Sequence, residues 1–317
     1  MSQANGFAGK IGVLMGGNSS ERSISLKSGE AVLAALRQKE YDVIPLDVQG
    51  SRLEILNKIK NSGITLAFIT LHGKGGEDGF IQTLLEEINL PYIGSNPEGS
   101  KKASNKLESK KIFDQNGIPT PRYAMISGKD WQKKIEGLAF PLFIKPVDEG
   151  SSIGVKKIKN MDEMLTVAPK ELDEYDSLLV EEGITGRELT VGILGGKALP
   201  VIELKPKREF YDYTAKYTKG MTEYLVPAPI APETAARVQQ MALEAFRVLG
   251  LRDFSRVDFM LNQKEEPFVL EVNTIPGFTE TSLLPKAAKE AGIEFADVCS
   301  TLIYLAKERN YAHGKKK

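Results

Sequence analysis

The sequence contains a single cysteine, Cys299, so no disulfide bond can form within the chain. It has only two histidines, and no pair of cysteine or histidine residues has the spacing of a zinc site. Neither sign of charge is in excess, because 42 lysines and arginines balance 42 aspartates and glutamates. A chain without net basic charge is not expected to bind nucleic acid or an anionic membrane.

Long hydrophobic runs are absent as well. No apolar stretch reaches the length of a transmembrane helix, and the first residues show no signal-peptide core. Together with the lone cysteine, this predicts a soluble cytoplasmic protein. The length of 317 residues, with 41% apolar and 26% charged residues, is typical of a globular protein of two or three lobes.

Several common catalytic motifs are also missing. The glycine-rich loops GKGGEDG (73–79) and EGSSIG (149–154) do not match the Walker P-loop, and there is no clean G-x-G-x-x-G fingerprint. No serine nucleophile elbow is present either. The backbone N–H groups of such loops can still bind phosphate oxygens, although a plain tight turn is the alternative interpretation of each loop.

The chain changes its pattern near Pro121. Before this point strand and helix patterns alternate, which predicts a parallel sheet with ligand-binding loops at the carboxyl ends of its strands. After it, short strands joined by turns dominate until a helix over 231–250, a hairpin and further helices. The predicted fold class is α/β followed by α+β. In the first part the strands are expected at 10–17, 41–48, 66–71 and 91–94.

Two unusual segments lie in the second part of the chain. The aromatic stretch KREFYDYTAKYTKGMTEYLVPAPI (207–230) is weakly patterned, and a connection of that length is more often a functional loop than a plain connector. The second segment, RVDFMLNQKEEPFVLEVNTIPG (256–277), predicts a hairpin with polar residues inside apolar strands. By strand alternation, Val269, Glu271 and Asn273 are expected on one face.

The acids of this hairpin suggest a metal site. With a four-residue loop, Asp258 lies opposite Glu271 and Arg256 lies opposite Asn273. Like charges that face each other destabilise a sheet, and a hard cation such as Mg²⁺ would remove the repulsion. Two solvated acids on an edge hairpin are the alternative.

Three lysines and three further acids accompany this candidate site. A solvated surface charge is the favoured interpretation of any one of the three lysines alone, although a lysine at 145, inside an apolar strand, should not be buried without an anionic partner. Together the lysines and a metal would supply what the phosphates of a nucleoside triphosphate require. The acids are either a solvated strand end or the edge of a nucleotide pocket, and His72 is either structural or part of an active site. The lysines are Lys106, Lys145 and Lys216, and the acids are Glu181, Glu182 and Glu188.

Eight stretches in sequence order carry a family resemblance. They are GGNSSERSISL, HGKGGEDG, NKLESKK, IKPVDEGSSIGV, VEEGITGRELTVGIL, FYDYTAKY, RVDFM and LEVNTIPGFTETSLLP, and they extend over most of the chain. With these motifs the chain resembles the D-alanine–D-alanine ligases of the ATP-grasp superfamily.

The resemblance implies an ATP-grasp fold with an N-terminal Rossmann-like parallel-sheet domain. It implies a substrate domain at 1–100, a central ATP-grasp lobe at 101–187 and a C-terminal lobe at 188–317. The implied activity joins two D-alanines through an acyl phosphate for peptidoglycan precursor synthesis. The implied requirements are ATP and two Mg²⁺ ions, which Mn²⁺ can replace, and the implied assembly is a homodimer.

The resemblance also implies a role for individual residues. Tyr217 is similar to the tyrosine of dipeptide-forming members, which favours an amine over the hydroxyl group of D-lactate as the second nucleophile. Catalytic roles fall on Glu21, Ser151, Tyr217, Arg256 and Gly277. Substrate contacts fall on Glu21, His72, Arg256, Gly277, Ser282 and Leu283. ATP contacts fall on Lys106, Lys145, Ser151, Glu181, Glu182, Ile184, Glu188, Lys216 and Glu271, and magnesium ligands are Asp258, Glu271 and Asn273.

Three other functions compete with this interpretation. One is an ATP-grasp ligase for a different pair of amino acids, and another is a nucleotide-binding module without catalysis. The third is a nicotinamide-dependent enzyme, which the missing glycine fingerprint disfavours. Ser282, on the substrate side, opposes a different pair of amino acids. The complete set of Arg256, Asp258, Glu271 and Asn273 opposes a module without catalysis.

Overall fold

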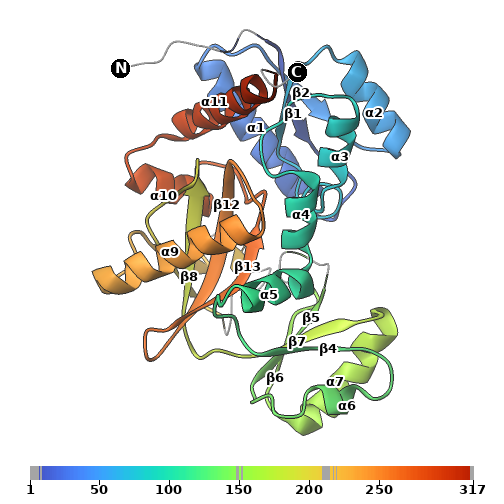
Figure 1. The fold of residues 1–317 in the computed structure, drawn as a ribbon, viewed down its shortest axis with the longest axis vertical. Helices are drawn as coiled ribbons and strands as arrows, with labels where there is room; N and C mark the ends of the chain where they lie inside the picture. The colour runs from blue at the N-terminus through green and yellow to red at the C-terminus, as the bar shows by residue number, and fades with distance from the viewer. Residues whose placement is uncertain are drawn as a thin grey trace.

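The computed structural model describes residues 7, 9–147, 150, 153–208, 215–216, 218 and 220–314, with side chains up to residue 309. Three separate sheets organise this part of the chain, and Figure 1 shows them one below another, each with its own helices. The mixture of a parallel sheet with two antiparallel sheets agrees with the predicted fold class.

The first sheet is parallel, as predicted, and its strand order is β2-β1-β3. All five residues of β1 are buried, which explains the continuous apolar run in the sequence. The strand expected at 91–94 forms only a single bridge between Ala67 and Tyr92, because Pro91 donates no N–H and Gly94 turns the chain at φ 106°. The elements are β1 (Ile11–Met15), α1 (Arg22–Gln38), β2 (Val43–Asp47), α2 (Arg52–Asn61), β3 (Leu66–Ile69) and α3 (Phe80–Glu87).

The second sheet is antiparallel, with strand order β4-β7-β5-β6. A stretch that the sequence analysis assigned to strands and turns contains the helix α7, so that assignment was wrong there. Asn160 caps α7 by accepting a hydrogen bond from Glu163 N–H at 3.0 Å, and Met164 and Ala168 bury one face. The elements from the linking helices onward are α4 (Pro97–Ser104), α5 (Lys106–Gln115), β4 (Tyr123–Ile126), α6 (Trp131–Lys134), β5 (Leu142–Pro146), β6 (Lys156–Ile158), α7 (Met161–Glu174) and β7 (Leu178–Glu182).

The third sheet has the order β11-β10-β8-β12-β13, with β9 paired to β8. The predicted helix over 231–250 is present as α9, and Gly250 follows its end with φ 70°. The elements are β8 (Gly186–Leu194), β9 (Lys197–Ala198), β10 (Ile202–Pro206), β11 (Thr222–Leu225), α9 (Pro232–Val248), β12 (Phe254–Asn262), β13 (Pro267–Asn273), α10 (Leu283–Glu290) and α11 (Phe295–Gly314).

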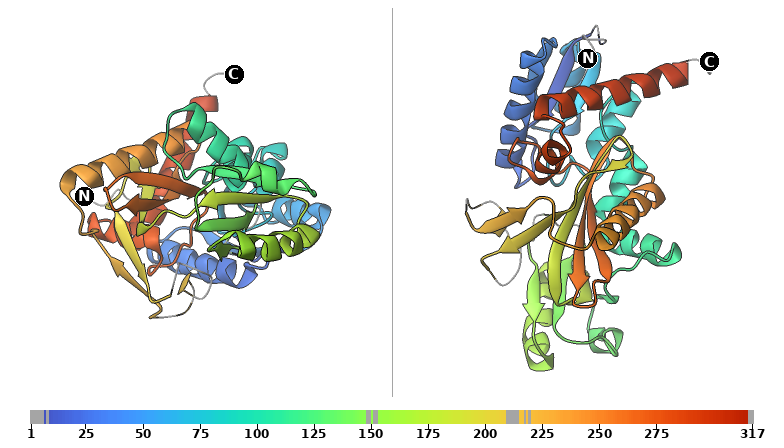
Figure 2. Two further views of the ribbon diagram at one scale, coloured as in Figure 1. Left: turned by 90° about the horizontal axis from the view of Figure 1, so that it is seen from below. Right: turned by 90° about the vertical axis from the view of Figure 1, so that its left-hand side faces the viewer.

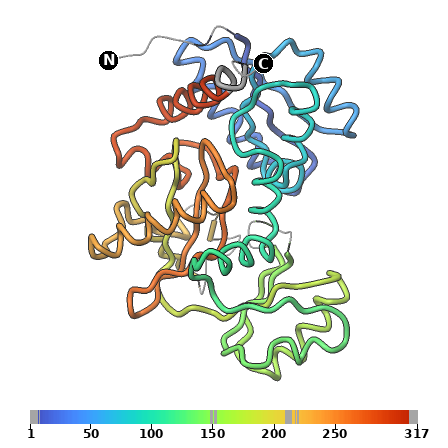
Figure 3. Tube along the Cα trace, viewed as in Figure 1, coloured from blue at the N-terminus to red at the C-terminus, as the bar shows by residue number. Residues whose placement is uncertain are grey.

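The last helix returns to the first sheet. Val298, Cys299 and Leu302 of α11 join one buried cluster with Ile11 and Phe68 of the parallel sheet. Figure 2 shows α11 alongside the N-terminal unit, and Figure 3 traces the chain down through α4 and α5 to the central sheet and back. In the described residues, no helix is long and apolar enough to cross a membrane.

Candidate active site

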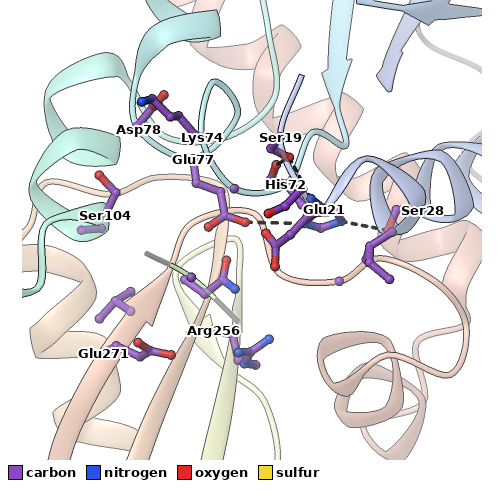
Figure 4. A pocket seen from close by; sticks show the side chains of 18 of the residues that line it. Ser19, Glu21, Ser28, His72, Lys74, Glu77, Asp78, Ser104, Arg256 and Glu271 are labelled. Carbon is purple, nitrogen blue, oxygen red and sulfur yellow. Dashed lines mark hydrogen bonds and ion pairs between the residues drawn. The ribbon is translucent and has the colours of Figure 1, made fainter. Parts of the chain in front are cut away.

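A cavity of about 1350 Å³ opens where residues from all three sheet units meet. Its walls come from the loops after β1, β3 and β13 and from the junction of α4 with α5 (Figure 4). Lys216 lines the cavity as well. The loops after β1 and β3 follow the carboxyl ends of parallel strands, as the α/β pattern predicted. The predicted site residues that line it are Glu21, His72, Lys106, Lys216, Arg256, Glu271, Asn273, Gly277, Ser282 and Leu283.

The hairpin pairs Asp258 with Glu271 and Arg256 with Asn273, as predicted. Its connection is not the expected four residues, however. Pairing starts at Leu261 and Pro267, and a bulge between the Phe259 and Asp258 pairs restores the expected register.

The bulge also corrects the predicted faces of β13. Val269 and Val272 are both buried in the core under α9, whereas Glu271 and Asn273 are half-buried and reach the cavity. Val269 therefore does not share a face with the two polar residues. One extra residue between them reverses the alternation, and in this way the strand keeps an apolar core face while it presents its polar residues to the site.

Arg256 forms a bidentate ion pair with Asp258, which the sequence analysis missed. Its Nε donates to Asp258 Oδ1 at 2.8 Å and its terminal nitrogen donates to Oδ2 at 2.7 Å. Thr190 Oγ1 also donates to Asp258 Oδ1, at 2.6 Å. Residues two apart on a strand share a face, so the spacing R-x-D was the signal that could have predicted this pair.

Glu271 and Glu188 have pKa values shifted in opposite directions. Burial alone would raise the pKa of Glu271, but the charges of Lys106, Lys216 and Lys145 outweigh it and lower this pKa to about 2. For Glu188 on β8, burial dominates and raises the pKa to about 7, with the Asp258 and Glu271 charges adding to the rise. Burial lowers the pKa of Lys106, and the Glu271 charge opposes part of that shift.

Lys145 has the anionic partner that its place in an apolar strand required. Its Nζ contacts Glu181 Oε1, and Glu181 is almost fully buried on β7. A second, fully buried lysine, Lys110 on α5, lies 3.0 Å from Glu181 Oε2. Glu181 is therefore not part of a solvated strand end, and sequence reasoning did not identify Lys110.

His72, at the end of β3, connects two other polar side chains of the cavity wall (Figure 4). Its Nε2 is 3.0 Å from Ser28 Oγ, and its Nδ1 is 3.5 Å from Glu77 Oε1. Ser28 Oγ accepts the backbone N–H of Phe278 at 3.2 Å and can also donate its own hydrogen to His72 Nε2, whereas the Glu77 carboxylate can only accept. This assigns the neutral ring the tautomer with its proton on Nδ1, facing the Glu77 carboxylate.

The glycine-rich loop after His72 packs directly against Glu21. A Cβ atom on Gly73 would lie 2.9 Å from Glu21 Oε2, and Gly73 has φ 67°, so both space and backbone require glycine here. Glu21 is buried at the start of α1 and its carboxylate makes no helix cap. Its side chain lines the cavity.

The loop after β13 is ordered by hydroxyl groups. Ser282 Oγ accepts Thr279 N–H at 3.1 Å and lies 2.9 Å from Thr279 Oγ1. A Cβ atom on Gly277 would approach Ser282 Oγ to 3.3 Å. Gly277 and Ser282 are therefore neighbours at the cavity, beside the N-terminal end of α10.

Comparison with known proteins identifies the family. The chain matches the model described as D-ala D-ala ligase C-terminus over residues 112–304 and the model described as D-ala D-ala ligase N-terminus over residues 10–53. It is 45% identical to a D-alanine–D-alanine ligase of Methylacidiphilum infernorum, with 96% of this chain and 97% of that protein covered. The chain belongs to the D-alanine–D-alanine ligase family.

Solved structures of the family have the same fold. The D-alanine–D-alanine ligase from Bacillus anthracis complexed with ATP superposes with a TM-score of 0.83 at 32% identity, covering 96% of this chain and 100% of that one. The VanG D-Ala:D-Ser ligase from Enterococcus faecalis superposes with a TM-score of 0.80 at 32% identity, covering 94% and 99%. Fold similarity therefore extends to ligases with different second substrates.

The remaining predicted residues of this family member lie outside the cavity wall or outside the described residues. Glu182 pairs with Arg122 at 3.1 Å and accepts Ala139 N–H at 2.8 Å. Ile184 is half-buried in the turn between β7 and β8. Lys145, Glu181, Glu188 and Asp258 are not among the residues that line the cavity. Ser151 and Tyr217 lie outside the described residues.

The predicted magnesium ligands of this family member provide three hard oxygen donors. In the described residues, no three histidine, cysteine, aspartate or glutamate side chains are close enough together to hold a metal. The predicted set contains only two side chains of these types, Asp258 and Glu271, which pair across the hairpin. Its third member is the amide of Asn273. Carboxylate and amide oxygens suit Mg²⁺, so the donor chemistry fits.

Proposed function

We propose that this chain joins two D-alanines to D-alanyl-D-alanine at the expense of ATP, with release of ADP and phosphate, for peptidoglycan precursor synthesis. The observation that carries the proposal is one cavity lined both by a buried acid, Glu21, and by the charged group of Lys106, Lys216 and Glu271. An ammonium group needs the first and a triphosphate needs the second. The high identity to D-alanine–D-alanine ligases supports this pair of ligands.

In the first step, the carboxylate of one D-alanine attacks the γ-phosphorus of ATP, the bond to ADP breaks, and an acyl phosphate forms. Glu21 holds the ammonium of this D-alanine, and Ser151 and Tyr217 form hydrogen bonds toward it. Lys106, Lys145 and Lys216 offset the charge on the transferred group. The adenine and the ribose are held by the segment that contains Glu181, Glu182, Ile184 and Glu188.

In the second step, the amine of the other D-alanine attacks the acyl carbon and phosphate leaves. Arg256 and the Gly277 N–H stabilise the tetrahedral oxyanion, which requires Arg256 to exchange part of its contact with Asp258. Ser282 and the start of α10 at Leu283 bind the carboxylate of this second D-alanine. His72 stands beside the first substrate.

Asp258, Glu271 and Asn273 would hold two Mg²⁺ ions, or Mn²⁺ in their place, and the ions would neutralise phosphate charge. The low pKa of Glu271 keeps its carboxylate ionised at neutral pH, as a ligand must be. We also propose domains at 1–100, 101–187 and 188–317, a cytoplasmic homodimer, and closure of segment 208–220 over the nucleotide.

The experiment that tests this function is ADP release from ATP and Mg²⁺ with D-alanine, with L-alanine and no amino acid as controls. We expect release only with D-alanine, and a dipeptide of the corresponding mass. ATP binding without ADP release would instead favour a non-catalytic module. ADP release that requires D-serine as the second substrate would favour a ligase for a different pair of amino acids.

Tyr217 tests the choice of second nucleophile. We expect Tyr217→Phe to gain D-lactate incorporation at neutral pH relative to the unaltered chain, while dipeptide formation falls. Comparable turnover of the unaltered chain with D-lactate and D-alanine would contradict the assigned preference for an amine.

A further inference from the structure

Lys110 is a fully buried lysine that the proposed mechanism leaves without a task. Only 1% of its side chain is exposed, although it lies on α5 one turn after the cavity residue Lys106. A lysine is almost never buried to this degree unless an anionic or polar partner holds it. Its Nζ lies 3.0 Å from Glu181 Oε2 and donates to Thr120 Oγ1 at 2.6 Å.

The carboxylate of Glu181 is enclosed by two lysines, because Lys145 contacts its other oxygen, Oε1. Burial alone would raise the pKa of Glu181, but the charges of Lys110 and Lys145 outweigh it and lower the pKa below its usual range. Glu181 therefore remains an ionised acceptor inside the protein.

One oxygen of this buried carboxylate still lacks a hydrogen bond. Glu181 Oε2 receives no aligned hydrogen bond from the part of the chain that the structure describes, even though Lys110 Nζ is close. A carboxylate oxygen can accept two hydrogen bonds, so Oε2 can accept a second donor in addition to its ion pair with Lys110.

The same lysine connects the central and C-terminal sheets, and Figure 1 shows α5 at the seam between them. Thr120 Oγ1, which accepts from Lys110, donates to Val269 O of β13 at 2.8 Å. Val269 N in turn donates to Pro119 O at 2.8 Å. Lys110 thus fixes Glu181 of β7 relative to the strand that carries Glu271.

A purely structural role does not require these charges. Well-packed apolar side chains often replace a buried ion pair without loss of stability. The retained charges and the open acceptor both point to recognition of a ligand.

We propose that Lys110 is a positioning residue for the choice of nucleotide base: it orients Glu181 Oε2 to accept a hydrogen bond from an exocyclic amino group. The inference rests on the proposed function, in which this region holds the base of ATP. A base with a carbonyl group at the same position presents an acceptor to the carboxylate and is bound more weakly.

The test compares the binding of ATP and ITP, which differ in this amino group, by calorimetry without D-alanine. We expect the unaltered chain to bind ATP at least tenfold more tightly, the size of one hydrogen bond to a charged group. Lys110→Met should reduce the ATP/ITP ratio about tenfold, and Lys110→Arg should retain part of it. The matched control is Lys111→Met, which removes an exposed lysine of the same helix.

Thr120→Val provides a milder variant if Lys110→Met does not fold, because it keeps the charge and breaks the connection to Val269. It should reduce the ATP/ITP ratio several-fold. An unchanged ratio in the folded variants, or equal binding of both nucleotides by the unaltered chain, overturns the proposal. Base preference without D-alanine-dependent ADP release would instead refute only the proposed reaction.

Discussion

Two regions of the site differ in how their charges are balanced, the region around Glu181 and the region around Glu271. Around Glu181 the ion pairs are closed inside the protein, with Lys110 and Lys145 within contact distance. Around Glu271 several charges of both signs converge on an open cavity. In the first arrangement two lysines already hold the carboxylate and one of its oxygens can accept a further donor, whereas the second gathers charges whose balance a triphosphate would change. We infer that the region around Glu181, the selecting end, chooses the nucleotide base, and that the region around Glu271, the reactive end, takes part in the reaction.

Arg256→Met should have the largest effect on activity, because it removes a positive charge from the reactive end and leaves the selecting end unchanged. We expect kcat to fall about 10²–10³-fold, as for the loss of one oxyanion donor. ATP binding at the selecting end should change little. The measurement is D-alanine-dependent ADP release, with Arg247→Met, an exposed arginine of α9, as the control. A loss below tenfold would contradict the assigned role.

The raised pKa of Glu188 predicts that the stability of the folded chain depends on pH. Its pKa of about 7 lies above the value of 4.5 in the unfolded chain, so the folded state binds more protons between these values. The contribution to stability is fully present below pH 4.5 and is lost as pH rises toward 7, by roughly 3 kcal/mol. Glu188→Gln should remove this slope.

The measurement is the free energy of unfolding in urea at several pH values between 4.5 and 8, without nucleotide or metal. The control is Glu136→Gln, which changes an exposed acid in the turn after α6. Parallel pH curves for the unaltered chain and Glu188→Gln would show that Glu188 does not titrate in this range.

His72 gives the smallest expected effect. Because the chain has only two histidines, ¹⁵N spectra can report the tautomer of each, and His313→Gln identifies the second signal. We expect neutral His72 to carry its proton on Nδ1. Ser28→Ala should mix the tautomers and change the KM for D-alanine a few-fold. A pure Nε2–H signal in the unaltered chain would contradict the hydrogen-bond assignment.

Local pattern sufficed for part of the site. An apolar strand with one lysine indicated a buried partner for Lys145, and alternating acids indicated the pairing of Asp258 with Glu271. The partner of Lys145 could not be named, because Glu181 lies on another strand and pairing between distant strands leaves no short-range signal.

Other features depended on register and on tertiary packing. A bulge changes which face a residue occupies, and nothing in PFVLEVN marks the extra residue, so Val269 was placed on the wrong face. Lys110 reads as one of several charges on a polar helix, and only its burial between two sheets distinguishes it. Helix α7 was overlooked, although Asn160 and the spacing of Met164 and Ala168 were visible signals.

The packing of α11 against the first sheet has a consequence for synthesis in the cell. The parallel sheet leaves the ribosome well before Val298, Cys299 and Leu302, which complete its buried cluster. Until then Ile11 and Phe68 lack part of their cover, and a nascent chain in that condition is prone to aggregation. A stop codon shortly before Val298 should therefore leave the parallel sheet near the start of the chain without part of its core.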